Sequence, residues 1–201
     1  MTAIQGPGSH GGAVRPPRPA LPYTRRQALS LVLLMTGAGL LGYVGSQYWY
    51  TYHAQRSLEA HWERQAAAAP ATDQPLTRIS IPKIDLDAIV VEGASNDQLA
   101  AGPGHVTDTA LPGEIGNAVI TAHRDTFFRR IFELDQGDEI TVERNGRRFR
   151  YQVTGKKIVK PEDVSVLDPT NDAQLTLITC YPIHYIGPAP KRLVVFSKLE
   201  P

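Results

Sequence analysis

The most constraining feature of this sequence is a long uncharged run near its beginning. No Lys, Arg, Asp or Glu occurs from Gln27 to Gln55, a run of 29 positions, and leucine and valine dominate its first half. About 20 apolar residues in a helix are enough to cross the hydrocarbon core of a bilayer. Aromatic residues gather where such a helix would reach the far interface, namely Tyr48, Trp49, Tyr50 and Tyr52. The run therefore predicts one transmembrane helix, which we place at residues 27–50.

The charges before this run predict its direction in the membrane. Four arginines and no acidic residue precede it, at positions 15, 18, 25 and 26. Because basic flanks stay on the cytoplasmic side, we expect a single-pass protein of the cell (inner) membrane, with everything after Tyr52 exported. The beginning of the chain is rich in glycine and proline and poor in large apolar residues. That composition predicts a disordered cytoplasmic tail over residues 1–26.

Two other interpretations of the apolar run stay open. A cleaved signal peptide needs a small-residue site soon after its apolar stretch, and the nearest candidate, around Ala66 to Ala69, lies about twenty residues beyond it. The pair Arg25-Arg26 could also belong to a twin-arginine export signal. Paired arginines are equally what simple control of topology requires.

Charge and cysteine content exclude several functions. The 201 residues carry 21 basic and 20 acidic side chains, a balance that argues against binding of nucleic acid by phosphate neutralisation. Residues 1–75 hold six basic and three acidic side chains, whereas residues 76–201 hold fifteen and seventeen. We therefore expect a stem or linker over residues 51–75 and one domain over residues 76–201. The single cysteine excludes an internal disulfide, a cysteine-based zinc site and a Cys-x-x-Cys redox pair.

From residue 76 onward the pattern is one of short strands and turns. A β-hairpin with a type I′ turn is predicted around Asn145-Gly146, because alternating apolar and polar residues flank this dipeptide. Residues 96–101 and 126–134 resemble short helical turns. The strands that we expect lie at 79–81, 88–91, 117–122, 139–144, 147–153, 175–179 and 193–196. Many short strands with little helix predict a mainly β fold, a closed or nearly closed barrel.

Three polar residues stand at the ends of these strands. Cys180 directly follows one strand, His123 follows another, and Arg192 opens the last one twelve positions after the cysteine. A thiol needs a base or a cationic neighbour to serve as a nucleophile, and acyl transfer needs a positive or hydrogen-bonding group for the developing oxyanion. Cysteine, histidine and arginine fill these roles, although spacing alone does not establish that the three meet.

Motifs around these three residues resemble those of sortases, the membrane-anchored cysteine transpeptidases that attach proteins to bacterial cell walls or build pili. The resemblance covers about residues 76–199 in the family's order. Its motifs are Thr176-Leu177-Ile178-Thr179-Cys180, Thr121-Ala122-His123-Arg124-Asp125-Thr126-Phe127-Phe128, Ala189-Pro190-Lys191-Arg192-Leu193-Val194-Val195, and the segments 102–105 and 111–117. The resemblance implies a closed β-barrel of seven to eight strands with short helices.

The resemblance also implies a mechanism. Cys180 would attack the threonine carbonyl of a Leu-Pro-x-Thr-type C-terminal sorting signal and form a thioacyl enzyme. His123 would protonate the departing amine and later deprotonate the incoming one, and Arg192 would bind substrate and stabilise the oxyanion. As supporting residues, Arg124 and Asp125 would hold the histidine loop, and Thr179 would line the groove.

The partners implied by the resemblance are proteins with a sorting signal, an amine such as a cell-wall precursor or a pilin lysine, and membrane lipid. No cofactor is expected. We expect no required metal either, because no acidic cluster reproduces the calcium site of class A sortases. The histidine motif and the Cys-Tyr-Pro sequence look most like class D, and class E is the neighbouring possibility.

Several alternatives remain at this stage. His105 matches the family pattern but is interpreted as a structural hydrogen-bonding residue, and His184 is a rival base four positions after the cysteine. The arginines of the predicted hairpin are interpreted as a solvated face. For the protein as a whole, the rival hypotheses are a non-catalytic barrel that binds surface peptides and an exported redox-sensing module built on Cys180.

Overall fold

The computed structural model describes residues 24–67 and 76–201. Nearly all of the predicted disordered tail (1–26) and the last part of the predicted stem (51–75) lie outside these described residues. Both therefore stay predictions.

The uncharged run forms part of one long helix, α1 (Arg25–Ala67). Thr24 caps its beginning, because the Thr24 hydroxyl accepts from the Gln27 amide while the Gln27 side chain accepts from the Thr24 amide. The stretch Arg25–Arg64 is long and apolar enough to cross a membrane, with a mean hydropathy of 1.8 in its most apolar window. The same helix continues into the first part of the predicted stem (51–75) and ends at Ala67.

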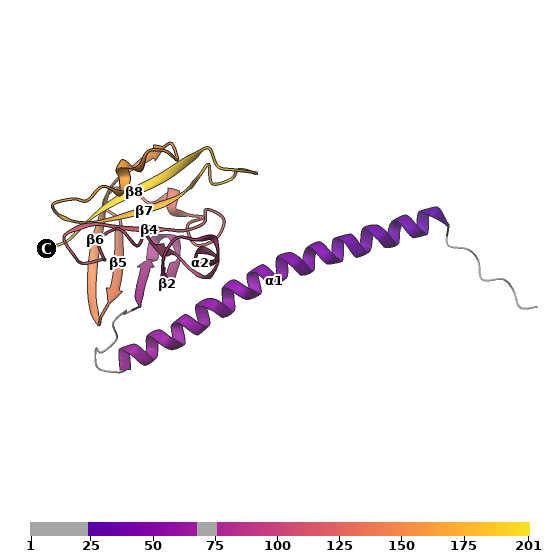
Figure 1. Cartoon of the computed structure of the whole chain (residues 1–201), viewed down its shortest axis with the longest axis horizontal. Helices are drawn as coiled ribbons and strands as arrows, with labels where there is room; N and C mark the ends of the chain where they lie inside the picture. Colours follow the sequence, from indigo (N-terminus) through magenta and orange to yellow (C-terminus); the bar gives the residue numbers. More distant parts are fainter. Residues whose placement is uncertain (1–23, 68–75) are drawn as a thin grey trace, which may run out of the picture. The chain divides into compact units, whose positions relative to one another are not determined.

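The second part of the chain folds into a closed barrel of eight strands, which confirms the predicted fold class (Figure 1). Around the barrel the strands follow the order β1-β2-β3-β4-β7-β8-β6-β5. The pairs β2/β3 and β4/β7 are parallel, and the other pairs are antiparallel. The strands are β1 (Thr77–Ile81), β2 (Leu86–Glu92), β3 (Gly104–His105), β4 (Gly116–Thr121), β5 (Glu139–Arg144), β6 (Arg147–Val159), β7 (Ala173–Tyr181) and β8 (Lys191–Leu199).

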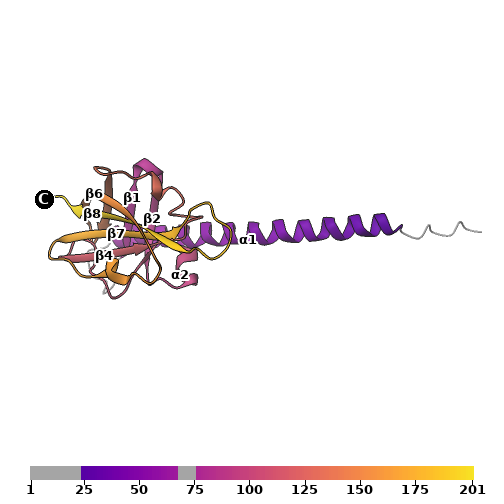
Figure 2. The same ribbon diagram turned by 90° about the horizontal axis from the view of Figure 1, so that it is seen from above.

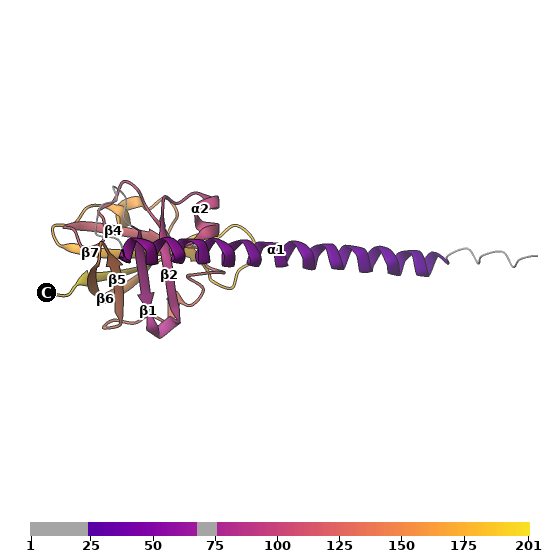
Figure 3. The ribbon, with the colours of Figure 1, turned by 90° about the horizontal axis from the view of Figure 1, so that it is seen from below.

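Short helices connect some of the strands. They are α2 (Asn96–Ala101) and the 3-10 helices η1 (Pro82–Ile84), η2 (Ile131–Glu133) and η3 (Val164–Leu167). The β1–β2 hairpin turns through η1 (Figure 3). The bounds of α2 agree with the predicted helical turn at residues 96–101. Ser95 and Gln98 form a capping box at its start.

The predicted hairpin is confirmed as β5 and β6. Asn145 and Gly146 both have positive φ, 55° and 69°, as a type I′ turn requires. Strand β3 was not predicted, because it contains only a glycine and a histidine and carries no alternating pattern.

A side chain of α1 completes the backbone hydrogen bonding of β2. β3 is so short that it pairs only with Val91 and Glu92, which leaves the β2 edge at Ile89 without a strand partner on that side. The Gln55 side chain accepts from the Ile89 amide at 3.1 Å and donates to the Ile89 carbonyl at 3.3 Å. It also donates to the Ala101 carbonyl at 2.6 Å. One glutamine thus substitutes for a missing stretch of strand.

Alternate residues of each strand fill the barrel interior. Ala118 and Ile120 of β4 and Leu175 and Leu177 of β7 belong to the main core cluster, together with the fully buried Tyr151. The segment after β4 closes one end of the barrel with three more fully buried side chains, Phe128, Ile131 and Leu134.

The outer face of β7 and β8 has a smaller core of its own. Val194 packs there with Val166 of η3, and Ile178 of β7 packs against the same cluster. The connection from β6 to β7 therefore covers part of this outer face. Figure 2 shows β4, β7 and β8 side by side.

Asn117 of β4 links the covered face to the β6–β7 connection. Only 3% exposed, it donates to the Val166 and Asp168 carbonyls at 2.9 and 3.2 Å. Its side-chain oxygen accepts from the Thr176 hydroxyl at 2.6 Å. The buried amide is thus satisfied on both its nitrogen and its oxygen.

We expect Asn117→Asp to destabilise the barrel by about 2 kcal/mol or more, because a carboxyl group cannot donate two hydrogen bonds and leaves buried carbonyls unpaired. Guanidinium denaturation of the detergent-solubilised chain measures the change. The matched control is Asn171→Asp at an exposed position. Equal stability of the two variants would contradict the role given to Asn117.

An ion-pair network fixes the chain between β4 and β5. Lys83 of η1 lies 3.2 Å from a carboxylate oxygen of Asp135 and 2.7 Å from one of Asp138. Lys156 of β6 lies 3.1 Å from Asp135. Hydrogen bonds from Lys156 and Lys83 hold the pKa of Asp135 below its ordinary value.

This lowered pKa predicts a pH dependence of stability. A carboxyl group whose pKa is lower in the folded state stabilises that state above its unfolded pKa of about 3.9, and the contribution is lost as the pH falls through the folded value. We expect Asp135→Asn to reduce the difference in denaturation midpoint between pH 7 and pH 3. The exposed Asp108 provides the control, since Asp108→Asn should leave that difference as in the wild type.

Candidate active site

The pairing of β4 with β7 brings His123 and Cys180 to neighbouring strand ends. In this parallel pair Thr121 lies opposite Ile178, so the two residues that follow at the same spacing are His123 and Cys180. The Thr121 hydroxyl and the Ala122 amide both donate to the Ile178 carbonyl, at 3.1 and 3.2 Å. The strand ends are therefore joined directly before both residues.

Arg192 joins them through the pairing of β7 with β8. Cys180 and Arg192 are directly opposite partners in this antiparallel pair, and such partners project side chains from the same face of a sheet. That face is the outer one, because Leu177 and Leu193 point into the barrel core and side chains alternate along a strand. The pairing of β7 with β8 thus brings Cys180 and Arg192 together, which their spacing in the sequence alone did not establish.

The same alternation places His123 on this face. Ala118, Ile120 and Ala122 belong to the interior core, so the extended backbone directs the next residue outward. His123, Cys180 and Arg192 therefore come from three adjacent strands, at one end of the barrel and on one face.

The polar atoms of these residues are largely free to meet a substrate. All three side chains are half-buried. Within residues 24–67 and 76–201, neither the Cys180 sulfur nor the His123 ring has a hydrogen-bond partner. Arg192 uses Nη1 to donate to the Ala189 and Lys191 carbonyls, at 3.3 and 3.0 Å. Its Nε and Nη2 have no partner among the described residues. The arrangement offers a thiol, an imidazole and unused guanidinium N–H groups on one face, at one end of the barrel.

The chain that follows His123 is anchored by core packing, a backbone hydrogen bond and ion pairs. The buried Phe128 follows it and donates its amide to the His123 carbonyl at 3.2 Å. Farther along, Arg130 forms ion pairs with Glu133 and Asp85. The hydrogen bonds from Arg130 lower the pKa of Glu133. The histidine thus projects from a segment fixed by core packing and ion pairs.

The supporting residues take different places from those expected. Thr179 is 1% exposed and donates to the Ala122 carbonyl at 2.7 Å, so it joins β7 to β4 and does not line a groove. Asp125 is exposed and has no hydrogen bond or ion pair with the part of the chain that the structure describes. Arg124 reaches the loop after β7, where it donates to the Pro182, Tyr185 and Gly187 carbonyls. None of the three forms a hydrogen bond or ion pair with the His123 ring among the described residues.

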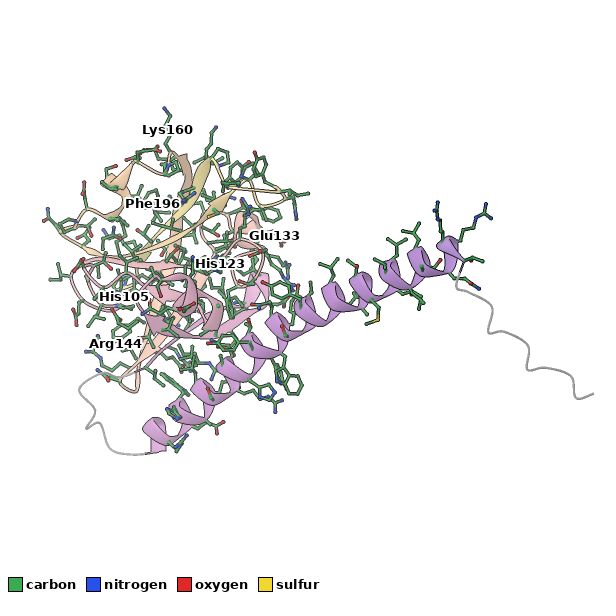
Figure 4. All side chains as sticks on the ribbon, turned by 45° about the vertical axis from the view of Figure 1, so that its right-hand side comes forward. His105, His123, Glu133, Arg144, Lys160 and Phe196 are labelled. Carbon is green, nitrogen blue, oxygen red and sulfur yellow. The ribbon has the colours of Figure 1, made fainter. Side chains whose placement is uncertain are left out.

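The other two candidate histidines contact residues other than His123, Cys180 and Arg192. His105 is 4% exposed; one ring nitrogen contacts the Glu92 carboxylate at 3.0 Å and the other the Ala110 carbonyl at 3.0 Å. This agrees with a structural role. Figure 4 shows His105 and Arg144 toward one side of the barrel, and His123 and Glu133 toward the other. His184 is exposed and stacks edge-on against Phe132, with ring centroids 6.3 Å apart.

One contributor to the site was missed from the sequence. Thr121 was noted only as part of a motif, yet its hydroxyl joins β4 to β7 just before the histidine. A threonine at the end of an apolar strand was the available signal, but it does not reveal which neighbouring strand accepts the hydrogen bond. Among the described residues, no three His, Cys, Asp or Glu side chains are grouped to hold a metal ion. The expected absence of a metal stays a prediction.

Comparisons with known proteins agree with this geometry. A family model of the sortase domain matches residues 79–200. Sortase D of Bacillus subtilis (strain 168) is 38% identical over 137 residues, which is 68% of this chain and 69% of the relative. Sortase SrtE1 of Streptomyces coelicolor is 28% identical over 212 residues, which is 90% of this chain and 59% of the relative.

Solved structures share the fold. A Clostridium perfringens Sortase D5 transpeptidase aligns with a TM-score of 0.58 and 28% identity, over 71% of this chain and 89% of the other. Sortase A of Corynebacterium diphtheriae, a lid mutant, aligns with a TM-score of 0.59 and 32% identity, over 69% of this chain and 76% of the other.

The similarity to Sortase D supports the class D assignment made from the motifs. The chain belongs to the sortase family of cysteine transpeptidases.

Proposed function

We propose that this protein is a membrane-anchored sortase that cleaves a Leu-Pro-x-Thr-type C-terminal sorting signal and transfers the acyl group to an amine. The observation that carries the proposal is the convergence of His123, Cys180 and Arg192 on one face of β4, β7 and β8. Helix α1 would serve as the anchor, with the N-terminus cytoplasmic and the barrel outside. The amine would come from a cell-wall precursor or a pilin lysine.

The first half of the reaction is peptide cleavage, as in a cysteine endopeptidase. The Cys180 sulfur attacks the threonine carbonyl carbon as the thiolate, while His123 is the imidazolium, and the bond from that carbon to the following nitrogen breaks. His123 donates the proton that the departing amine takes up. The product is a thioester between the threonine carbonyl and Cys180.

The second half of the reaction reverses the roles. The nitrogen of the acceptor amine attacks the thioester carbon, and His123 takes its proton. The carbon–sulfur bond breaks, an amide forms, and Cys180 is released as the thiolate beside the protonated His123.

Arg192 supports both halves. Each step passes through a tetrahedral intermediate whose oxygen carries negative charge, and preorganised donors stabilise that charge. Because only Nη1 of Arg192 is engaged among the described residues, Nε and Nη2 remain to bind the oxyanion. The position opposite Cys180 suits this role.

We expect the full chain in detergent to form a thioacyl adduct with a peptide from a varied Leu-Pro-x-Thr panel, detected by mass spectrometry. Cys180→Ala should abolish the adduct, because no other thiol occurs in the chain. His184→Ala, which changes an exposed histidine that contacts the Phe132 ring and has no hydrogen bond to His123, Cys180 or Arg192 among the described residues, should form it normally.

A folded wild type that forms no adduct with any peptide would contradict the proposed enzymatic activity and favour a non-catalytic barrel. A thiol that only undergoes reversible oxidation would favour the redox-sensing alternative.

Replacement of Arg192 should slow acylation without unfolding the protein. Loss of one oxyanion donor costs about 10² to 10³ in rate in other acyl-transfer enzymes, and we expect Arg192→Ala to fall in that range in single-turnover assays. Arg150→Ala, at an exposed position of β6, is the matched control. If both variants acylate at the wild-type rate, Arg192 does not stabilise the transition state.

A further inference from the structure

The loop between Cys180 and Arg192 lacks the usual sources of order. Residues 182–190 contain three prolines, which have no N–H to donate. No backbone-to-backbone hydrogen bond involves these nine residues among those described. The tip is exposed, with Ile186 fully accessible and Tyr185 47% exposed. Such a segment needs side chains from elsewhere to hold its shape.

Arg124 supplies that support from the neighbouring strand end. Its Nη1 donates to the Pro182 carbonyl at 3.3 Å, and its Nη2 donates to the Tyr185 and Gly187 carbonyls at 2.9 and 2.8 Å. The positive φ of Gly187, 107°, turns the chain so that two carbonyls converge on one nitrogen. The guanidinium also lies 5.8 Å from the centre of the Tyr185 ring.

The second arginine of the site holds the far end of the same loop. Arg192 donates to the Ala189 carbonyl and to the carbonyl of Lys191. Two arginines therefore divide the loop between them, with Arg124 holding residues 182–187 and Arg192 holding its end. If Arg192 turns toward a substrate, the contacts of Arg124 are the ones that remain.

We propose that Arg124 is a positioning residue, which fixes the 182–190 loop and thereby sets how Cys180 and Arg192 meet a bound substrate. The inference rests on the proposed function, because it concerns the same reaction. It assigns to Arg124 a partner other than the histidine loop that the sequence suggested. Arg124 follows His123 directly, so its side chain ties the histidine segment to the loop that follows the cysteine.

The fork shape of the guanidinium, and not its charge alone, is what the three contacts require. Arginine presents five N–H donors in a fixed plane, whereas lysine offers one compact ammonium. The single nitrogen of a lysine cannot replace both Nη1 and Nη2, so it cannot hold the Pro182 carbonyl together with the Tyr185 and Gly187 carbonyls. Arg124→Lys should therefore behave more like Arg124→Ala than like the wild type, whereas a purely electrostatic role would be rescued by lysine.

The test compares Arg124→Ala, Arg124→Lys and Arg129→Ala in the full chain. Arg129 is exposed, belongs to the same segment and has no side-chain partner among the described residues, so it controls for loss of a nearby charge. Three readouts are used: acylation of Cys180 by a Leu-Pro-x-Thr peptide, alkylation of Cys180 by iodoacetamide, and chymotrypsin cleavage after Tyr185, each followed by mass spectrometry.

We expect both Arg124 variants to lower kcat/KM by about 10 to 10²-fold, mainly through a higher KM, since a misplacement of about 1 Å can cost 10²-fold. Cleavage after Tyr185 should become several-fold faster, and alkylation of Cys180 by iodoacetamide should stay unchanged. Arg129→Ala should match the wild type in all three measurements.

The outcomes separate this inference from the proposed function. If the wild type itself forms no adduct, the proposed function fails. If the wild type reacts and Arg124→Ala reacts equally fast, or if Arg124→Lys restores the full rate, the positioning role is wrong while the enzyme stands. Should Arg124→Ala fail to fold, Arg124→Lys and its cleavage after Tyr185 still decide the question.

Discussion

The parallel pairing of β4 with β7 is the constraint on which the rest of the structure depends. Parallel strands cannot be joined by a tight turn, so the chain forms β5 and β6 before it returns beside β4. That return brings together residues 57 positions apart, since Thr121 lies opposite Ile178. Near the ends of these two strands, the hydroxyls of Thr121 and Thr179 each donate a hydrogen bond to a backbone carbonyl of the opposite segment. An error of one residue in this register would turn the cysteine into the core.

The alternation of side chains then places the residues of the core and the residues of the site on opposite faces of the same strands. Aliphatic side chains from β4, β7 and β8 belong to the core inside the barrel. The next residue along each strand faces outward, and there the site forms. Because the core holds the strands rigidly, outward residues at their ends keep fixed positions without hydrogen bonds between one another. This explains how His123, Cys180 and Arg192 can be aligned while their polar atoms stay available.

Whether a feature could be predicted from the sequence depends on how far apart along the chain its interacting residues lie. The Asn145-Gly146 hairpin and the capping box at Ser95 are local, and both were predictable or explicable from adjacent residues. The three catalytic candidates were found because they stand at strand ends and match family motifs. Strand β3 was not predicted, since a strand of two residues shows no alternating pattern. The burial of Thr179 and the carbonyl partners of Arg124 depend on how strands that are distant in the sequence pair. No local sequence pattern specifies that register.

The two arginines show why residue type alone does not define a role in this site. Both lie beside strand ends, both are half-buried, and both donate to carbonyls of the same loop. Arg124 engages three carbonyls through both terminal nitrogens, so its donors are committed to the protein. Arg192 engages two through one nitrogen, so donors remain for a substrate. A guanidinium can stabilise a transition state only with N–H groups that the folded chain has not already used. Counting the committed donors therefore separates the residue that shapes the site from the one that acts in it.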